Sequence, residues 1–173
     1  MPQRTLFNLL SAPMRPGRVV WIGLRPARRA PLTPVGQGAL DPLTGLAGDH
    51  YTNRNSRSRQ VTLIAQEALG AIAAYLGRTV VEPGMLRRNI VIAGINPHAL
   101  KSRGVRIGSV ELQITGECHP CSRMEEIFGP GGYNAVRGHG GLTARILTPG
   151  IVRLGDPVAC VDAASAACTE PPG

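Results

Sequence analysis

The chain has 173 residues, a formal net charge of +8 and a single lysine, Lys101, so arginine supplies nearly all of the positive charge. This length suits one domain with its own hydrophobic core, and so many guanidinium groups suit either an anionic ligand or a solvated surface. Aromatic residues make up only 3% of the chain and are not interleaved with basic runs, which argues against binding of nucleic acid.

Cysteine content and hydropathy indicate the cellular compartment of the protein. Four cysteines are too few for a fold of this length built on disulfides. No apolar stretch approaches the roughly 18 residues of a membrane span, and the N-terminus lacks an apolar core followed by a cleavage site. We therefore expect a cytoplasmic protein with free thiols and no contact with a membrane.

Glycine and proline punctuate the whole sequence, with 22 and 15 residues respectively. Such punctuation predicts many short elements joined by tight turns, which favours a mainly β fold. The segments with β-branched composition or alternating polarity are, in chain order, 19–24, 60–64, 90–92, 105–107, 110–114, 142–147, 151–154 and 158–161.

The spacing of these segments predicts two hairpins. One joins 105–107 to 110–114 across Gly108-Ser109, and the other joins 142–147 to 151–154. Residues 25–42 carry four prolines and three arginines, a composition typical of a loop or an edge strand.

Helical segments interrupt the strands, and one of them is a short turn predicted from Asn96-Pro97 through Leu100. Residues 66–76 place their apolar side chains on one face and are followed by Gly77, and 124–128 predicts one or two further turns. No linker divides the chain, so we expect one domain. Its predicted limits are 18–162, with a lead-in of residues 1–17 that packs partly on it and a flexible tail of residues 163–173.

The densest chemistry lies at residues 116–123, where Cys118, His119 and Cys121 fall within four positions and Arg123 follows. A thiolate can attack an electrophile, exchange with a disulfide or bind a soft metal, and a neighbouring guanidinium favours the charged sulfur. Pro120 fixes its own φ, so the thiols lie on a bent segment.

Three interpretations of this segment stay open. A structural zinc site would need a second pair of ligands at a compatible spacing, which the sequence does not offer clearly. A thioredoxin-like pair would begin a long helix, whereas a short helix and a glycine-rich segment follow here. One thiolate would suffice to bind a metal carried by an organic cofactor, whose phosphate nearby arginines would contact.

Polar residues elsewhere have two possible roles. Asp49, His50, Arg57 and Arg59 belong either to an exposed loop or to the rim of a site. Arg87 and Arg88 precede the strand at 90–92 and form either a solvated pair or an anion clamp.

The glycine-rich segment 129–141 carries Tyr, Asn, Arg and His at its centre. It is either a flexible linker or a loop whose backbone N–H groups approach an anion, and we favour the loop.

Five motifs, in order and spacing, resemble the MOSC domain, the module found at the C-terminus of molybdenum cofactor sulfurases and in stand-alone bacterial proteins. The resemblance runs from about residue 18 to residue 161. The motifs are Gly45-Leu46-Ala47-Gly48-Asp49-His50, Arg59-Gln60-Val61-Thr62-Leu63-Ile64, Pro83-Gly84-Met85-Leu86-Arg87-Arg88-Asn89-Ile90, Gly116-Glu117-Cys118-His119-Pro120-Cys121 and Val152-Arg153-Leu154-Gly155-Asp156-Pro157-Val158.

This resemblance implies a MOSC-type β-barrel with a few short helices and a molybdopterin-type molybdenum cofactor, and pyridoxal phosphate binding at the level of the family. In related proteins that reduce amidoximes and N-hydroxylated bases, a cysteine ligates molybdenum, and Cys121 matches it. Cys118 would be a persulfide carrier, a resolving thiol or a gate. Where many members have Glu-Asn, this chain has Arg88-Asn89, which replaces a carboxylate by a cation.

The function that the resemblance implies is the two-electron reduction of an N-hydroxylated small molecule, with electrons from a separate protein. Cys121 is the expected metal ligand, and Cys118, His119, Asp49 and His139 are the other expected catalytic groups. The alternatives are a persulfide carrier for metal-sulfur cofactors and a cofactor carrier without catalysis; the oligomeric state is not predicted. The expected cofactor contacts are Arg59, Arg87, Arg88, Asn89, Arg123, Gly131, Gly132 and Arg137.

Overall fold

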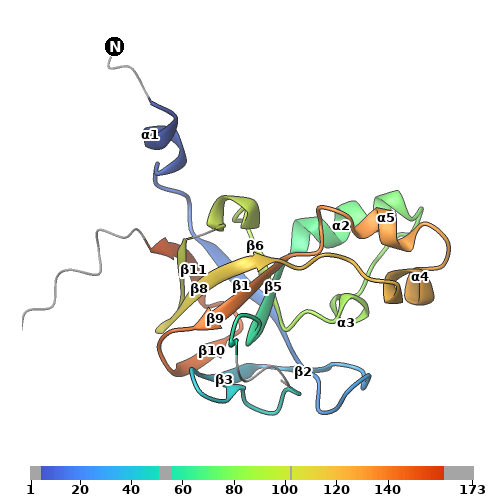
Figure 1. Ribbon diagram of the computed structural model, residues 1–173, viewed down its shortest axis with the longest axis horizontal. Coiled ribbons are helices and arrows are strands. Elements are labelled where there is room, and N and C mark those ends of the chain that lie inside the picture. The colour runs from blue at the N-terminus through green and yellow to red at the C-terminus, as the bar shows by residue number, and fades with distance from the viewer. Residues whose placement is uncertain (1–4, 51–55, 102, 162–173) are drawn as a thin grey trace, which may run out of the picture.

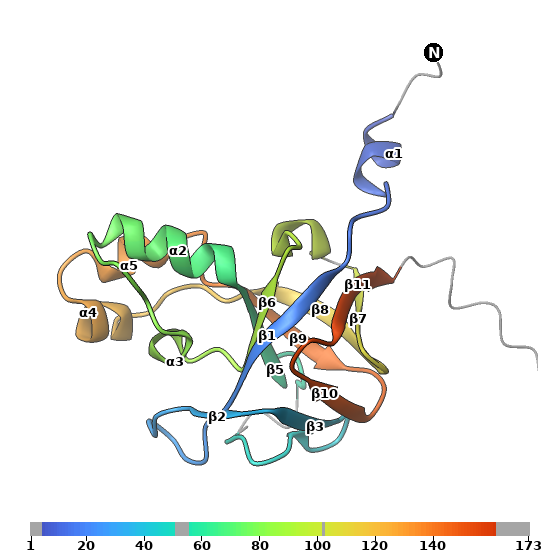
Figure 2. The same cartoon turned by 180° about the vertical axis from the view of Figure 1, so that it is seen from behind.

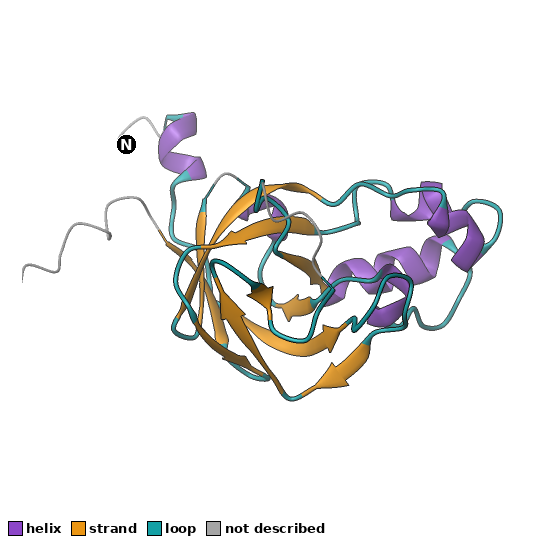
Figure 3. Cartoon of the chain, turned by 60° about the horizontal axis from the view of Figure 1, so that its bottom comes forward, coloured by secondary structure: helices purple, strands orange, loops and turns teal. Residues whose placement is uncertain are grey.

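Seven strands close into a barrel in the computed structural model, which describes residues 5–50, 56–101 and 103–161. Figure 3 shows the strands curling around the barrel axis, so the mainly β fold is confirmed. Around the barrel the order is β1 (Gly17–Leu24), β11 (Pro157–Val161), β7 (Gly104–Ile107), β8 (Val110–Glu117), β9 (Leu142–Ile146), β5 (Val61–Ala65) and β6 (Ile90–Ala93).

β1 closes the barrel. Its first residues pair with β11, in the register Gly17 to Val158, while its other edge pairs with β6. The last residues of β1 pair with the short β2 (Thr33–Val35), which extends the sheet beyond the barrel. β2 therefore agrees with the edge strand predicted within 25–42. Closure leaves few exposed strand edges to pair with other chains.

A second, three-stranded sheet has the order β10 (Gly150–Arg153), β3 (Gln37–Asp41) and β4 (Gly45–Leu46). The predicted hairpin between 142–147 and 151–154 is therefore wrong, because β9 stays in the barrel and β10 pairs with β3. The N–H groups of Leu147 and Thr148 both donate to Glu111 O and hold the chain on β8. Pro149 follows with no N–H to continue that pairing.

The core has two layers. The barrel interior is filled by aliphatic side chains from every strand of the barrel, among them Leu63, Ile90 and Ile92. A second layer lies outside, where Ile64 and Val91 pack under helices. Because both faces of β5 and β6 are covered, these two parallel strands are almost wholly apolar.

The helices of the second layer gather on one side of the barrel (Figure 1). The longest, α2 (Gln66–Tyr75), connects β5 to β6 and matches the helix predicted at 66–76. The predicted hairpin across Gly108-Ser109 is β7 and β8. The shorter helices of this layer are α3 (Pro83–Leu86), α4 (Arg123–Phe128) and α5 (Gly132–Val136). The 3₁₀ helix η1 (Pro97–Leu100) instead packs Leu100 into the barrel core.

The N-terminal segment lies apart from this body. Its helix α1 (Leu6–Leu10) has no buried residue and extends away from the barrel (Figure 2). From the described part of the predicted lead-in, Met14 packs against the barrel core. The predicted tail 163–173 lies outside the described residues. None of the described helices is long and apolar enough to cross a membrane.

Candidate functional site

An arginine-rich cavity of about 670 Å³ lies at the end of β8. Five arginines line it against two carboxylates, so its formal charge is positive. We call it the cysteine cavity, because both thiols of the segment 116–123 line it. Its lining residues are Arg25, Asp49, His50, Arg59, Thr62, Leu86, Arg87, Arg88, Asn89, Glu117, Cys118, His119, Pro120, Cys121, Arg123 and Met124.

The fold therefore brings together most of the site residues expected from the sequence. Nine of them line the cysteine cavity, although they come from separate segments between β3 and α4. They are Asp49, Arg59, Arg87, Arg88, Asn89, Cys118, His119, Cys121 and Arg123. Four others, His139, Gly131, Gly132 and Arg137, do not line it.

The two thiols differ sharply in exposure. Cys118 is the first residue after β8; its N–H donates to Gly141 O at 2.8 Å and its side chain is buried. Arg59 Nη2 lies 3.4 Å from Cys118 Sγ. Cys121 is exposed, one residue before the turn that begins α4. A ligand in the cavity therefore meets Cys121 more readily than Cys118.

Arg88 is a buried cation behind Cys118. Its Nε donates to Gly140 O at 2.6 Å and its Nη1 to Leu86 O at 2.8 Å. Burial lowers the pKa of the Arg88 guanidinium, and the negative charge of Cys118 opposes that shift. No ion pair joins Arg88 to a carboxylate within the described residues. The Arg88 guanidinium is therefore a fixed positive charge that an anionic ligand in the cavity could face.

Arg87, the neighbour of Arg88, has an unusual backbone. Its φ of 58° lies in the left-handed region, where it caps the C-terminus of α3. A residue with a Cβ adopts this conformation at a cost of about 1–2 kcal/mol. Burial, Arg25 and Arg123 together lower the pKa of the Arg87 guanidinium. Arg87 therefore lies in a part of the cavity that is already rich in positive charge.

Asp49 fixes the segment after β4 against the end of β1. Its Oδ1 accepts the N–H of Arg25 at 2.7 Å, and its Oδ2 lies 3.6 Å from Arg25 Nη2. The same Nη2 donates to His50 O at 2.6 Å. Sequence reasoning missed Arg25, whose only local signal is its place directly after the strand at 19–24.

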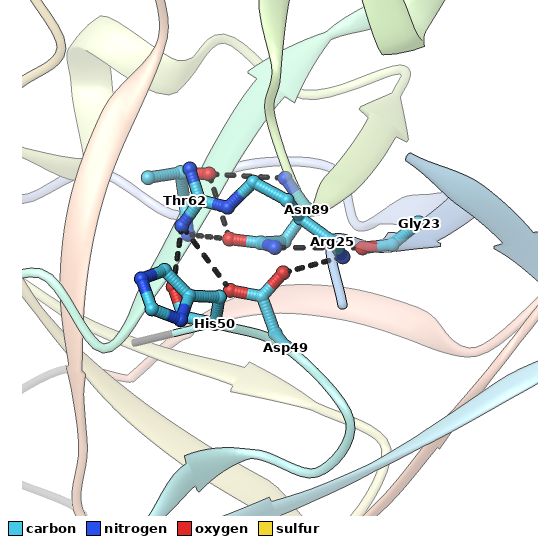
Figure 4. A network of polar contacts seen from close by, with 6 residues as sticks. All are labelled: Gly23, Arg25, Asp49, His50, Thr62 and Asn89. Carbon is cyan, nitrogen blue, oxygen red and sulfur yellow. Dashed lines mark hydrogen bonds and ion pairs between the residues drawn. The ribbon is translucent and has the colours of Figure 1, made fainter. Parts of the chain in front are cut away.

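Asn89 joins three strands of the barrel beside the cavity (Figure 4). Its Oδ1 accepts from Thr62 N and Thr62 Oγ1, at 3.2 and 2.9 Å, and its Nδ2 donates to Gly23 O at 3.4 Å. The Asn89 N–H donates in turn to Thr62 Oγ1 at 3.0 Å. Asn89 and Thr62 are therefore tied to the framework as well as lining the cavity.

Replacing Thr62 with valine tests this network. Valine keeps the volume but removes the hydroxyl, which leaves the buried N–H of Asn89 without its acceptor. We expect the free energy of unfolding, measured by urea denaturation, to fall by about 1–3 kcal/mol. Thr33→Val on the exposed β2 is the matched control, with an expected change within about 0.5 kcal/mol. Equal losses in both variants would contradict a structural role for the Thr62 hydroxyl.

The glycine-rich segment contains the helix α5, which the sequence did not predict. The N–H groups of Gly131 and Tyr133 both donate to the carboxylate of Glu125, at 3.0 and 2.9 Å. Gly132 packs so closely on Met124 O that a side chain would not fit. These amides are occupied within the protein, and Arg137 is exposed beyond the end of α5.

His139 belongs to a different cavity. Its ring packs on that of Tyr75, with 5.4 Å between the ring centroids. With Gly138 and Gly141 it lines a space of about 430 Å³ beside α2. The segment from Gly138 to Gly141 thus separates this apolar space from the cysteine cavity.

A small polar cluster surrounds Glu117 at the end of β8. Lys101 forms an ion pair and hydrogen bond with Glu117, which lowers the pKa of that carboxyl, and His98 and His119 add to the effect. The Nδ1 atom of His119 lies 4.0 Å from Glu117 Oε2, and its side chain is 78% exposed. His119 is therefore a solvent-accessible imidazole beside a carboxylate.

A zinc site made only of protein ligands is not found among the described residues, because no three His, Cys, Asp or Glu side chains converge. What the cavity offers is one exposed thiol, one buried thiol and several guanidinium groups. This donor set suits an anionic ligand, or a metal that an anionic cofactor carries.

Solved structures with the same fold come from several bacteria. The YuaD protein from Bacillus subtilis is similar at 17% identity with a TM-score of 0.70, over 83% of this chain and 94% of that chain. YiiM from Geobacillus stearothermophilus has 18% identity and a TM-score of 0.69, over 84% and 75%. YiiM from Escherichia coli has 19% identity and a TM-score of 0.63, over 84% and 70%. At these identities the likeness supports the fold alone.

Sequence comparison adds the family. None of the curated proteins matches the chain. The family model described as the MOSC domain matches residues 49–159, which is well over half of the sequence and includes every motif segment from Asp49 to Cys121. The chain therefore belongs to the MOSC domain family.

Proposed function

We propose that this protein binds a molybdopterin-type molybdenum cofactor in the cysteine cavity and reduces N-hydroxylated small molecules. The observation that carries the proposal is an exposed thiol, Cys121, at a cavity lined by five arginines. Membership of the MOSC family supports it, since MOSC domains are linked to molybdenum cofactor proteins.

The residues of the cavity fit such a cofactor. The volume of about 670 Å³ lies within the range of cofactor sites. Within the described residues, the Nε atoms of Arg25 and Arg123 are buried and have no hydrogen-bond acceptor. Because both side chains line the cavity, an anionic group there would supply the missing acceptors.

Each group would then have its own task. Cys121 would be the metal ligand, and Arg59, Arg87 and Arg123 would contact the phosphate, with Arg88 as a buried positive charge behind them. When bound, the cofactor supplies two-electron chemistry that removes oxygen from an N–O bond. Reduction of a hydroxylamine to an amine and water also consumes two protons.

Among His119, Asp49 and His139, which are expected catalytic groups able to carry a proton, we propose His119 as the proton donor. It is exposed and faces Glu117 in the cysteine cavity. Asp49 lines the same cavity but is engaged with Arg25, and His139 lines the other cavity. The two electrons would come from a separate donor protein. A reducing cytoplasm is the compartment we propose, since Cys121 must remain reduced to serve as a ligand.

The test is to purify the chain from a host that makes molybdenum cofactor and to measure metal and pterin in the same sample. We expect about one molybdenum and one pterin per chain, and turnover of an amidoxime or hydroxylamine with a chemical electron donor. Absence of both molybdenum and pterin would overturn the proposal. Bound cofactor without turnover of either substrate class would instead favour a carrier.

A second candidate function is persulfide transfer, and the surroundings of Cys118 favour it. Arg59 Nη2 contacts its sulfur at 3.4 Å and the buried Arg88 interacts with the same residue electrostatically, so two guanidinium groups lie close to this thiol. Mass spectrometry of the intact chain distinguishes this function. A reducible adduct of one sulfur atom, lost in Cys118→Ser and present without molybdenum, would support transfer over reduction.

A further inference from the structure

A second arginine-lined cavity, of about 500 Å³, adjoins the cysteine cavity. The two share four lining residues, and no carboxylate lines the second one. We call it the outer arginine cavity. Its lining residues are Arg25, Arg28, Arg29, His50, Arg87 and Arg123.

The positive charge of the outer arginine cavity is only partly balanced. Arg25 pairs with Asp49, and Arg123 Nη1 lies 3.7 Å from Glu126 Oε2. Arg28, Arg29 and Arg87 have no carboxylate partner in the part of the chain that the structure describes. Guanidinium groups this close repel one another, and a bound anion would relieve the repulsion.

Backbone geometry also marks this place. Three described residues other than glycine have a positive φ, and two of them, Arg29 at 66° and Arg87 at 58°, line the outer arginine cavity. Each conformation costs free energy, and such strain gathers where a ligand is held. Arg87 takes this conformation as the C-cap of α3. Among the described residues neither Arg29 nor Arg87 forms a side-chain hydrogen bond or ion pair, so both guanidinium groups are available to a ligand.

The shared wall of the two cavities contains the buried Nε atoms of Arg25 and Arg123, which lack an acceptor among the described residues. An anion seated at this wall would accept from both side chains. It would be continuous with a ligand in the cysteine cavity, because both arginines line both spaces.

We propose that the outer arginine cavity binds a second phosphate or diphosphate group of the ligand whose other part occupies the cysteine cavity. Two sources have this chemistry, namely a cofactor extended by a nucleotide and a phosphorylated substrate. The identity of that ligand rests on the proposed function, whereas the anion site itself does not.

The test is to titrate the full chain with inorganic pyrophosphate and with inorganic phosphate, by calorimetry at constant ionic strength. The chain is purified from a host unable to make molybdenum cofactor. The double variant Arg28→Gln/Arg29→Gln alters the outer arginine cavity alone. The matched control is Arg18→Gln/Arg153→Gln, which removes the same charge from exposed residues on β1 and β10.

We expect wild-type protein to bind pyrophosphate more tightly than phosphate. Affinity for pyrophosphate should fall about tenfold or more in Arg28→Gln/Arg29→Gln, and less than about twofold in the control. Failure of the wild type to bind pyrophosphate, or equal losses in both double variants, would overturn the proposal. If the Arg28/Arg29 double variant unfolds, the single variant Arg28→Gln is titrated with pyrophosphate in its place. An affinity equal to that of the wild type would then contradict the proposal.

Mass spectrometry separates the two sources. A nucleotide on the cofactor extracted from protein made in a cofactor-competent host assigns the second phosphate to the cofactor. An extracted cofactor without a nucleotide, together with tight pyrophosphate binding, assigns it to the substrate. Protein that contains neither molybdenum nor pterin yet binds pyrophosphate through Arg28 and Arg29 would refute the proposed function and leave the anion site standing.

Discussion

Replacing Cys121 with serine is expected to lower the molybdenum content of the purified protein at least about tenfold, because an alcohol is a poor ligand where a thiolate is required. Cys118→Ser should keep most of the metal, since the buried Cys118 side chain is 2% exposed and its sulfur already contacts Arg59. Molybdenum is measured by mass spectrometry of the metal, and pterin by fluorescence after oxidation, in the same preparations.

The two variants change the same atom three residues apart, so each controls for the other. Cys121 is exposed, and its replacement should leave the free energy of unfolding within about 0.5 kcal/mol of wild type. Metal loss in Cys121→Ser therefore cannot be attributed to unfolding. Metal loss confined to Cys118→Ser would reverse the assignment of ligand and accessory thiol. Equal metal content in all three proteins would remove both cysteines from the metal site.

Residue patterns predicted many of the strands and the outer helix α2 well, because those elements carry regular patterns, whereas the barrel itself was implied by the family resemblance. β5 and β6 are short apolar runs between turn signals, and α2 places its apolar residues on one face. β5 and β6 follow one another among the strands of the chain and pair in parallel, and the connection between them contains α2 and α3. Local pattern and tertiary contact agree there, so the prediction is confirmed.

The same reasoning was wrong for β9 and β10. Both segments alternate like strands, but an alternating pattern does not name the strand that lies alongside. β10 pairs with β3, more than a hundred residues earlier in the chain, and β3 itself lay hidden in a proline-rich segment. The helix α5 was missed for a similar reason. Its start depends on the carboxylate of Glu125, which accepts from two amides of the glycine-rich segment.

For the site, too, residues with a local sequence signal were predicted and residues brought in by the fold were missed. Cysteine spacing and the arginine pair before β6 are local signals, and they identified residues that line one cavity. Arg25 had no such signal, because its contact with Asp49 spans 24 residues. The sequence did not mark Arg28 and Arg29 as site residues, because it is the fold that brings their loop beside Arg87. Charge clusters built from distant segments cannot be read from a sequence in which arginine is common throughout.

Gly141 lies beside the candidate site at a position where a single added methyl group should be costly. Its φ is +86°, and an added Cβ would overlap Leu63 O and lie 3.1 Å from Ile64 Cα, both backbone atoms of β5. We expect Gly141→Ala to lower the free energy of unfolding by about 3 kcal/mol or more, measured by urea denaturation. The reason is that relief would require moving a central strand of the barrel.

Two other glycines separate the causes of that loss. Gly138 also has a positive φ, +77°, but no atom lies near its Cβ position, so Gly138→Ala should cost about 1 kcal/mol from conformation alone. Gly70 lies in α2 with open space around it, and Gly70→Ala should stabilise the protein by about 0.5–1 kcal/mol. Equal losses at Gly141 and Gly138 would contradict the close approach to β5.

Gly141 also links stability to the candidate site, because its carbonyl accepts the N–H of Cys118 at 2.8 Å. Displacement of Gly141 would break the hydrogen bond that holds the backbone of Cys118, and the Cys118 side chain would become more accessible. The exposure of Cys121 would not change. In a Cys121→Ser background, Cys118 should therefore be alkylated faster after Gly141→Ala than after Gly138→Ala. The rates are compared at urea concentrations well below those that unfold the protein. Identical alkylation rates would mean that the buried state of Cys118 depends on Arg59 and Arg88 rather than on this backbone contact.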